Sequence, residues 1–120
     1  MNKKVIIPIA LFIILVSIIL FLNKKDNVVE NSQIILFYGD GCPHCEIVDE
    51  YINENNIEDK APFIRKEVYN NKENTDELVL KAEACGIPTE SIGIPFLWDG
   101  SKCYVGDKEI IEFFKSKAGL

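Results

Sequence analysis

The chain has 120 residues, of which 48% are hydrophobic and 27% are charged, and this length accommodates one globular domain. Residues 33–120 contain seventeen acids and nine bases, which gives this part a net charge of −8. Because no basic residues cluster there, the composition excludes nucleic acid as a predicted partner.

An uncharged apolar run extends from Val5 to Leu22 and is interrupted only by Pro8 and Ser17. As a helix, a run of this length spans roughly 27 Å, near the thickness of the hydrocarbon core of a bilayer. A cleaved signal peptide usually has a shorter apolar segment followed by small residues, whereas Asn23-Lys24-Lys25 follows this run. The run therefore predicts a membrane anchor over residues 1–25, with flanking lysines, rather than a cleaved signal.

The charges around the anchor say little about its orientation. Lys3 and Lys4 precede the run and Lys24 and Lys25 follow it, so the positive-inside rule hardly discriminates between the two sides. The N-terminal amine adds one positive charge and favours an inside N-terminus. The predicted protein is a single-pass membrane protein with a polar linker at 26–32 and an extracytoplasmic domain at 33–120.

The domain begins with a strand, a turn and a helix. The apolar run Ile34–Tyr38 has strand length and ends at Gly39-Asp40-Gly41, so it predicts a buried strand. Beyond Cys42, apolar residues recur at helical spacing until Asn55-Asn56, namely Ile47, Val48, Tyr51 and Ile52. This pattern predicts a helix with the cysteines at its start.

A second strand and a second helix follow. Phe63–Tyr69 alternates well enough for a strand. Asn74 followed by Glu77 resembles a capping box that opens a helix, and Gly86 and then Pro88 mark its end.

The chain ends with a predicted hairpin and a third helix. Residues 95–98 and 102–105 are short strands around Asp99-Gly100. Asp107 is predicted to cap the last helix. The order β-α-β-α-β-β-α predicts an α/β fold.

The sequence Cys42-Pro43-His44-Cys45 places two thiols three residues apart at a helix start. A thiolate is the species that attacks a disulfide, and the unpaired N–H groups of a helix start favour negative charge. Pro43 suits the first helical position because its missing N–H loses no bond there. Cys45 lies on the same helix face, within reach of a disulfide. The spacing predicts a redox pair with Cys42 as the exposed nucleophile and Cys45 as the shielded resolving thiol.

His44 is the only histidine and lies between the two cysteines. It can donate to the thiolate or add positive charge, and either effect makes the disulfide a better oxidant. Nearby acids act in the opposite direction because they disfavour a thiolate, and these are Asp40, Glu46 and Asp49. The alternative for His44 is an exposed polar side chain without a role.

The arrangement resembles the thioredoxin superfamily over residues 33–120, with the compact proportions of glutaredoxins, and CPHC is similar to the motif of periplasmic disulfide oxidases. The resemblance implies a thioredoxin-like fold with a central four-stranded mixed sheet flanked by helices. It also implies a cis proline opposite the redox pair, matched by Pro95, with substrate backbone pairing at Ile94. By base rate an X-Pro bond is cis in only about 5% of cases, so Pro88 is predicted to be trans.

The sequence departs from these families in three respects. Leu36 stands six residues before Cys42, where thioredoxins have a buried acid that helps proton transfer, and Gly41 stands where they have Trp. Asp40-Gly41 and Gly93-Ile94-Pro95 replace the Lys and the Thr-Val-Pro of glutathione-using glutaredoxins. These departures argue against glutathione as a ligand.

Cys85 and Cys103 have two interpretations. Each falls on the apolar face of its predicted element, as a small buried core residue does. In an oxidising compartment they form a structural disulfide instead, if their Cα atoms come within about 7 Å.

The sequence thus predicts an enzyme, a thiol–disulfide oxidoreductase that acts on protein thiols and disulfides outside the cytoplasm and needs no cofactor. A membrane protein is the expected source of its redox equivalents. One alternative is a copper or zinc site at Cys42 and Cys45, although a second close cysteine pair is missing. The other is a glutathione-linked, glutaredoxin-type reductase.

Overall fold

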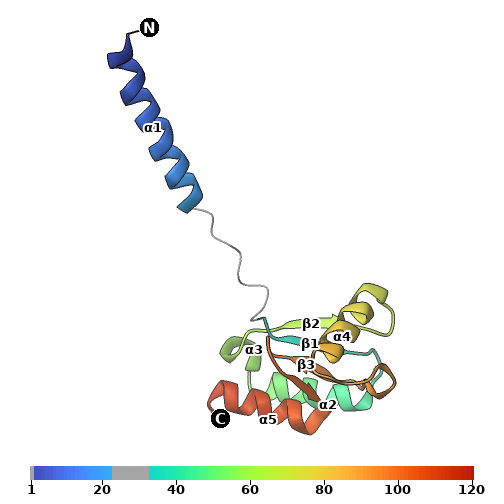
Figure 1. Ribbon diagram of the computed structural model, residues 1–120. Coiled ribbons are helices and arrows are strands. Elements are labelled where there is room, and N and C mark those ends of the chain that lie inside the picture. Colours follow the sequence, from blue (N-terminus) through green and yellow to red (C-terminus); the bar gives the residue numbers. More distant parts are fainter. Residues whose placement is uncertain (1, 23–32) are drawn as a thin grey trace. The chain divides into compact units, whose positions relative to one another are not determined.

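The computed structural model describes residues 2–22 and 33–120 (Figure 1). The predicted linker at 26–32 lies outside the described residues, as do Lys24 and Lys25. The chain divides into an N-terminal helical unit and a folded domain, and each is described by itself.

The N-terminal unit is one helix, α1 (Lys3–Leu22), of 20 residues. Its described side chains are exposed and almost all apolar. Over Lys3–Phe21 the helix is long and apolar enough to cross a membrane.

The domain is built on a four-stranded mixed sheet with the strand order β2-β1-β3-β4. Strand β1 pairs in parallel with β2 and antiparallel with β3, and β3 pairs antiparallel with β4. The strands are β1 (Ile35–Tyr38), β2 (Ile64–Glu67), β3 (Phe96–Trp98) and β4 (Cys103–Val105). The predicted α/β class and four-stranded mixed sheet are confirmed.

Helices cover both faces of this sheet (Figure 1). Successive residues of a strand point to opposite faces, so Leu36 packs against α2, α3 and α5, while Ile35 and Phe37 pack against α4. The helical segments are α2 (Pro43–Glu54), α3 (Ile57–Lys60), α4 (Lys72–Ala84), the 3₁₀ turn η1 (Thr89–Ser91) and α5 (Asp107–Ala118). Two apolar cores on either side of β1 hold the domain together.

Three local predictions were wrong. Helix α3 was not predicted, because four residues are too few to show a periodic pattern. Helix α4 is capped by Asn71, whose side chain accepts from the Asn74 N–H at 3.0 Å. The Asn74 amide instead donates to the Glu67 carbonyl at 2.8 Å, which ties α4 to the end of β2. Gly106 occupies the cap position of α5, and Asp107 is the first helical residue.

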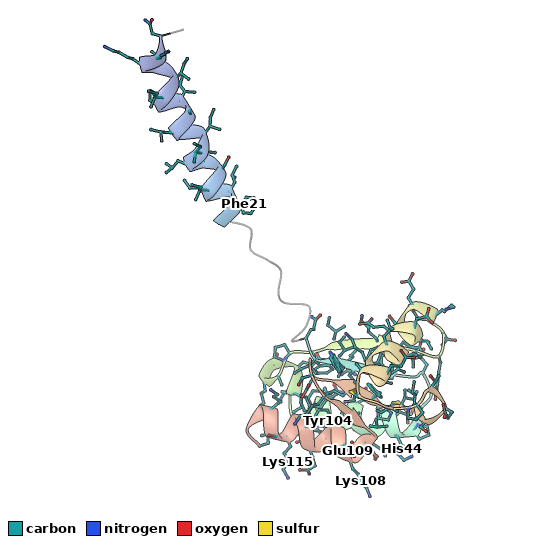
Figure 2. All side chains as sticks on the ribbon, in the orientation of Figure 1. Phe21, His44, Tyr104, Lys108, Glu109 and Lys115 are labelled. Atoms are coloured by element: carbon teal, nitrogen blue, oxygen red, sulfur yellow. A yellow bond between two sulfur atoms is a disulfide. The ribbon has the colours of Figure 1, made fainter. Side chains whose placement is uncertain are left out.

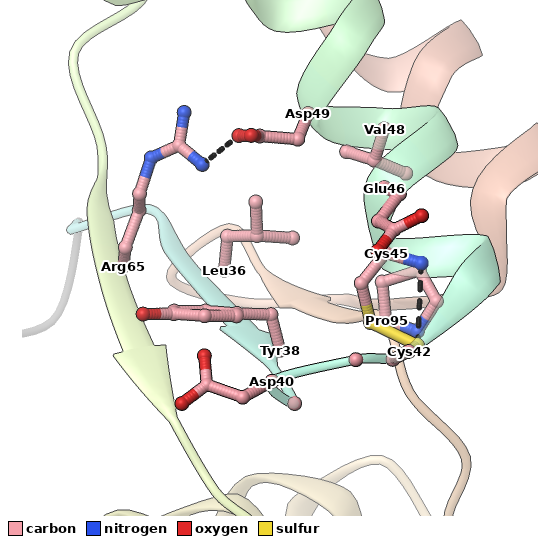
Figure 3. Close-up of a pocket in the computed structure, with 12 residues that line it drawn as sticks. Leu36, Tyr38, Asp40, Cys42, Cys45, Glu46, Val48, Asp49, Arg65 and Pro95 are labelled. Atoms are coloured by element: carbon pink, nitrogen blue, oxygen red, sulfur yellow. Dashed lines mark hydrogen bonds and ion pairs between the residues drawn. A yellow bond between two sulfur atoms is a disulfide. The ribbon is translucent and has the colours of Figure 1, made fainter.

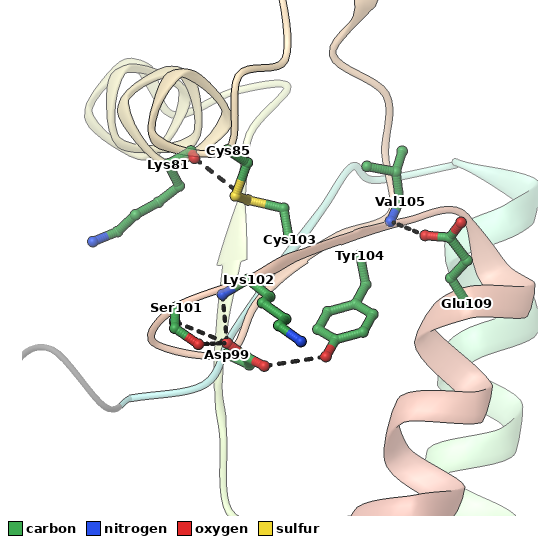
Figure 4. The surroundings of a disulfide bond; sticks show 9 residues. All are labelled: Lys81, Cys85, Asp99, Ser101, Lys102, Cys103, Tyr104, Val105 and Glu109. Atoms are coloured by element: carbon green, nitrogen blue, oxygen red, sulfur yellow. Dashed lines mark hydrogen bonds between the residues drawn. A yellow bond between two sulfur atoms is a disulfide. The ribbon is translucent and has the colours of Figure 1, made fainter.

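The two distant cysteines form a disulfide between the end of α4 and β4 (Figure 4). Their Cα atoms are 6.2 Å apart, and 18 positions separate them in the sequence. Of the two interpretations, the structural disulfide is therefore the correct one for Cys85 and Cys103. Since β4 is an edge strand, the bond fastens one side of the sheet to the helix that covers it.

Asp99 organises the hairpin turn between β3 and β4 (Figure 4). Its carboxylate accepts from the Ser101 and Lys102 N–H groups at 2.8 and 2.7 Å and from the Tyr104 hydroxyl at 3.2 Å. Partial burial alone would raise the pKa of Asp99, but these donors outweigh it and lower the pKa below its ordinary value. Burial and the neighbouring Asp99 charge raise the pKa of Tyr104.

The double variant Cys85→Ala/Cys103→Ala is expected to lose about 3 kcal/mol of unfolding free energy, because the bond closes a loop of this length in the unfolded chain. Urea titration of the full-length protein in detergent, followed by the fluorescence of Trp98, measures the loss. Cys85→Ala and Cys103→Ala alone serve as matched controls and should fall close to the double variant. A double variant as stable as the native protein would contradict the structural role of the bond.

Asp99→Asn is expected to cost about 1 kcal/mol at neutral pH, because it removes charge-assisted hydrogen bonds. The lowered folded pKa of Asp99 means that its stabilisation is fully present above the unfolded value of about 3.9 and is lost as pH falls through the folded pKa. Urea titrations at several pH values should show the two proteins converging in acid. The exposed Glu90→Gln serves as the control, and a difference that stays constant into acid would exclude the carboxylate as its source.

Candidate active site

The CPHC sequence forms the first turn of α2, as predicted. Cys42 is the cap residue of the helix, with φ −81° and ψ 115°, and Pro43 is its first residue. The Cys42 sulfur accepts a hydrogen bond from the Cys45 N–H at 3.2 Å. This is the position in which the unpaired N–H groups of a helix stabilise negative charge on a side chain.

Cys42 and Cys45 form a disulfide, with their Cα atoms 5.2 Å apart. Cys42 is 6% exposed and Cys45 is 8% exposed. In the disulfide form, residue exposure therefore does not distinguish the two cysteines, and the roles of nucleophile and resolving thiol stay predictions.

The turn between β1 and α2 is held by β2. The Glu67 carboxylate accepts from the N–H groups of Asp40, Tyr69 and Asn70 at 3.4, 2.7 and 2.9 Å. Desolvation would raise the pKa of Glu67, but these three donors outweigh it and lower the pKa. The Tyr69 ring lies against Gly39 so closely that a β-carbon there would collide with it. Glu67 and Tyr69 thus fix the path of the chain into the Cys42–Cys45 disulfide.

A pocket of about 320 Å³ opens beside the disulfide (Figure 3). One wall carries the two cysteines and Pro95, and the opposite wall comes from β1 and β2. Its other lining side chains are Leu36, Tyr38, Asp40, Glu46, Val48, Asp49 and Arg65. A pocket of this size is large enough to admit a side chain of a partner.

Pro95 follows a cis peptide bond, as the resemblance implied, and no other cis bond occurs within residues 2–22 and 33–120. It is fully buried and lines the pocket together with both cysteines. Ile94 is half-buried and packs on the α4 side of the sheet, and it is not part of the pocket lining. Substrate pairing at Ile94 stays a prediction.

Arg65 is a pocket residue that sequence reasoning missed. It forms ion pairs with Asp49 and Glu58. Partial burial would lower the pKa of Arg65, but the hydrogen bonds and charges of both acids outweigh it and raise the pKa. Asp49 was predicted to oppose the thiolate, and the structure shows that a cation balances its charge. The other two acids predicted to oppose it, Asp40 and Glu46, line the pocket.

His44 is in contact with an acid that the sequence did not indicate. Its Nδ1 lies 3.5 Å from Oδ1 of Asp107, at the start of α5. The His44 side chain is 67% exposed and that of Asp107 is 22% exposed. Since 63 positions separate the two residues, no local sequence signal could have paired them.

In the described part of the chain, no three His, Cys, Asp or Glu side chains lie together in a way that could hold a metal ion.

No protein-family model matches the chain, and no curated protein matches it at a significant level. What the site can do must therefore be inferred from its geometry. Two sulfurs at a helix start, next to a pocket that a partner side chain can enter, are suited to disulfide exchange.

Proposed function

We propose that this chain is a thiol–disulfide oxidoreductase of thioredoxin-like fold, which exchanges disulfides with protein substrates through Cys42 and Cys45. One observation carries the proposal: the Cys42–Cys45 disulfide lies at the N-terminus of α2 and forms a wall of an open pocket. A purely structural disulfide has no need of either feature.

The exchange transfers two electrons in two steps. The Cys42 thiolate attacks one sulfur of a substrate disulfide, which forms a mixed disulfide and releases the other substrate sulfur as a thiolate. The Cys45 thiolate then attacks the Cys42 sulfur, restores the Cys42–Cys45 bond and releases the second substrate thiolate. The substrate is reduced and the protein is oxidised, and the same steps in reverse oxidise a dithiol substrate. The Cys45 N–H, which already bonds to the Cys42 sulfur, favours the thiolate in either direction.

The arrangement of the domain supports the thioredoxin-like assignment. Its strand order, its helices on both faces and its redox pair at the start of α2 fit the expected architecture. Pro95 stands beside the disulfide, as the resemblance implies. Leu36 lines the pocket where thioredoxins have a buried acid, so the proton on Cys45 must leave by another route.

The N-terminal helix supports attachment to a membrane, and we propose that the domain lies on the extracytoplasmic side. Helix α1 has the length and composition of a membrane span. The Cys85–Cys103 disulfide suits an oxidising compartment outside the cytoplasm. A membrane protein in the same bilayer is then the natural source or acceptor of the two electrons. Among the described contacts, none favours the metal-binding or glutathione-linked alternatives.

Single cysteine variants test the proposal. Cys42→Ser is expected to reduce exchange with a model disulfide to the uncatalysed rate, because the attacking thiolate is lost. Cys45→Ser is expected to accumulate mixed disulfides through Cys42, because the resolving step is blocked. Non-reducing gels and mass spectrometry detect the trapped species, and Cys85→Ala/Cys103→Ala is the control that keeps the redox pair. Trapping by Cys42→Ser instead of Cys45→Ser would reverse the two roles, and no trapping by either would defeat the proposal.

Attachment to the membrane has a separate test. The full-length protein is expected to stay in the membrane fraction after a carbonate wash, because an apolar span of this length is held by the bilayer core. A variant with two apolar residues of α1 replaced, Leu11→Lys/Leu15→Lys, should move to the soluble fraction. A soluble native form that begins near Asp26 would show that the segment is cleaved as a signal.

A further inference from the structure

The junction between β4 and α5 touches both sides of the redox site. The Gly106 N–H donates to the Pro95 carbonyl at 2.9 Å, so the junction is bonded to the proline that faces the disulfide. The next residue, Asp107, pairs with His44 from the CPHC turn. Residues 105–107 therefore connect two parts of the site that lie far apart in the sequence.

In the pair between His44 and Asp107, the carboxylate is the fixed partner. Two hydrogen bonds fix the backbone next to Asp107. The Gly106 N–H donates to the Pro95 carbonyl, and the Val105 N–H donates to the Glu109 carboxylate at 3.0 Å. The Asp107 side chain is largely covered, whereas His44 projects into solvent (Figure 2). No other charged side chain within 33–120 pairs with His44. The imidazole is thus the more exposed partner, and in the disulfide form it lies beside Asp107.

We propose that Asp107 is a positioning residue that sets the redox poise of the Cys42–Cys45 pair by holding the imidazole of His44, an inference that rests on the proposed exchange function. Reduction of the disulfide creates a second anion, the Cys42 thiolate, within the same turn as His44. The His44 side chain can lie beside only one of these two anions at a time, so Asp107 competes with the thiolate for it. The Asp107 charge also disfavours a thiolate nearby.

Both effects destabilise the reduced form relative to the disulfide. Removing the carboxylate releases His44 to the thiolate and makes the pair a stronger oxidant. Because the pair is partly exposed, its effect belongs to the modest range of surface ion pairs. The expected change in the equilibrium constant is about threefold, which corresponds to about 14 mV for a two-electron couple.

The test compares wild type with Asp107→Asn as full-length proteins in detergent, equilibrated with buffers of reduced and oxidised glutathione. Alkylation of Cys42 and Cys45, read by mass spectrometry, gives the fraction reduced at each ratio. Asp107→Asn is expected to favour the reduced form about threefold. No shift, or a shift toward the disulfide, overturns the proposal.

Two further proteins separate positioning from a general charge effect. Glu112→Gln removes the same charge from an exposed position of the same helix without touching His44, and it should leave the equilibrium unchanged. In a His44→Ala background, Asp107→Asn should shift the equilibrium less than it does in the wild-type background, because only the direct effect of the charge remains, and an equal shift there overturns the role of His44. A wild-type pair that reaches no equilibrium with glutathione or dithiothreitol would instead defeat the proposed exchange function. Failure of this inference and failure of the function are therefore distinguishable.

Discussion

The burial of β1 on both faces is the constraint on which the site depends. Leu36 faces one apolar core while Ile35 and Phe37 face the other, and β1 lies inside the sheet between β2 and β3. From the end of β1 the chain continues through Gly39–Gly41 directly to the start of α2. Phe37 is paired with Phe96 in antiparallel register, so the residue before Phe96 arrives at the same end of the sheet. The meeting of Pro95 with the disulfide thus follows from how one apolar strand is paired.

The features that the sequence could predict are those with a local signal. Pro43 at the helix start and Asp99-Gly100 at the hairpin act on their immediate neighbours, and both elements occur where expected. The cap of α4 could not be chosen locally, because Asn71 and Asn74 are equally good cap residues. A bond across the fold, from the Asn74 amide to the Glu67 carbonyl, decides between them. The ion pairs of Arg65 and Asp107 were beyond prediction for the same reason.

The electrostatics of the site differ from what the composition suggests. A domain with a charge of −8 would be a poor place for a thiolate if every acid acted on it independently. Of the acids that line the pocket, Arg65 offsets Asp49, and the Glu67 carboxylate accepts hydrogen bonds from backbone N–H groups. The helix start can therefore stabilise a thiolate at Cys42 against less repulsion from nearby acids than their number implies. Pairing, more than net charge, determines the environment of the sulfurs.

The placement of the four cysteines also bears on how the chain matures. Four cysteines allow three connectivities, and the folded domain contains one of them, Cys42–Cys45 with Cys85–Cys103. Cys42 and Cys45 are three positions apart, whereas Cys85 and Cys103 are 18 apart, and closing a shorter loop has the lower entropic cost. Once Cys42 and Cys45 are bonded to each other, neither can pair with Cys85 or Cys103. These two cysteines can then pair only with each other. From the spacing we therefore expect the near bond to form first and the native pairing of the other two cysteines to follow.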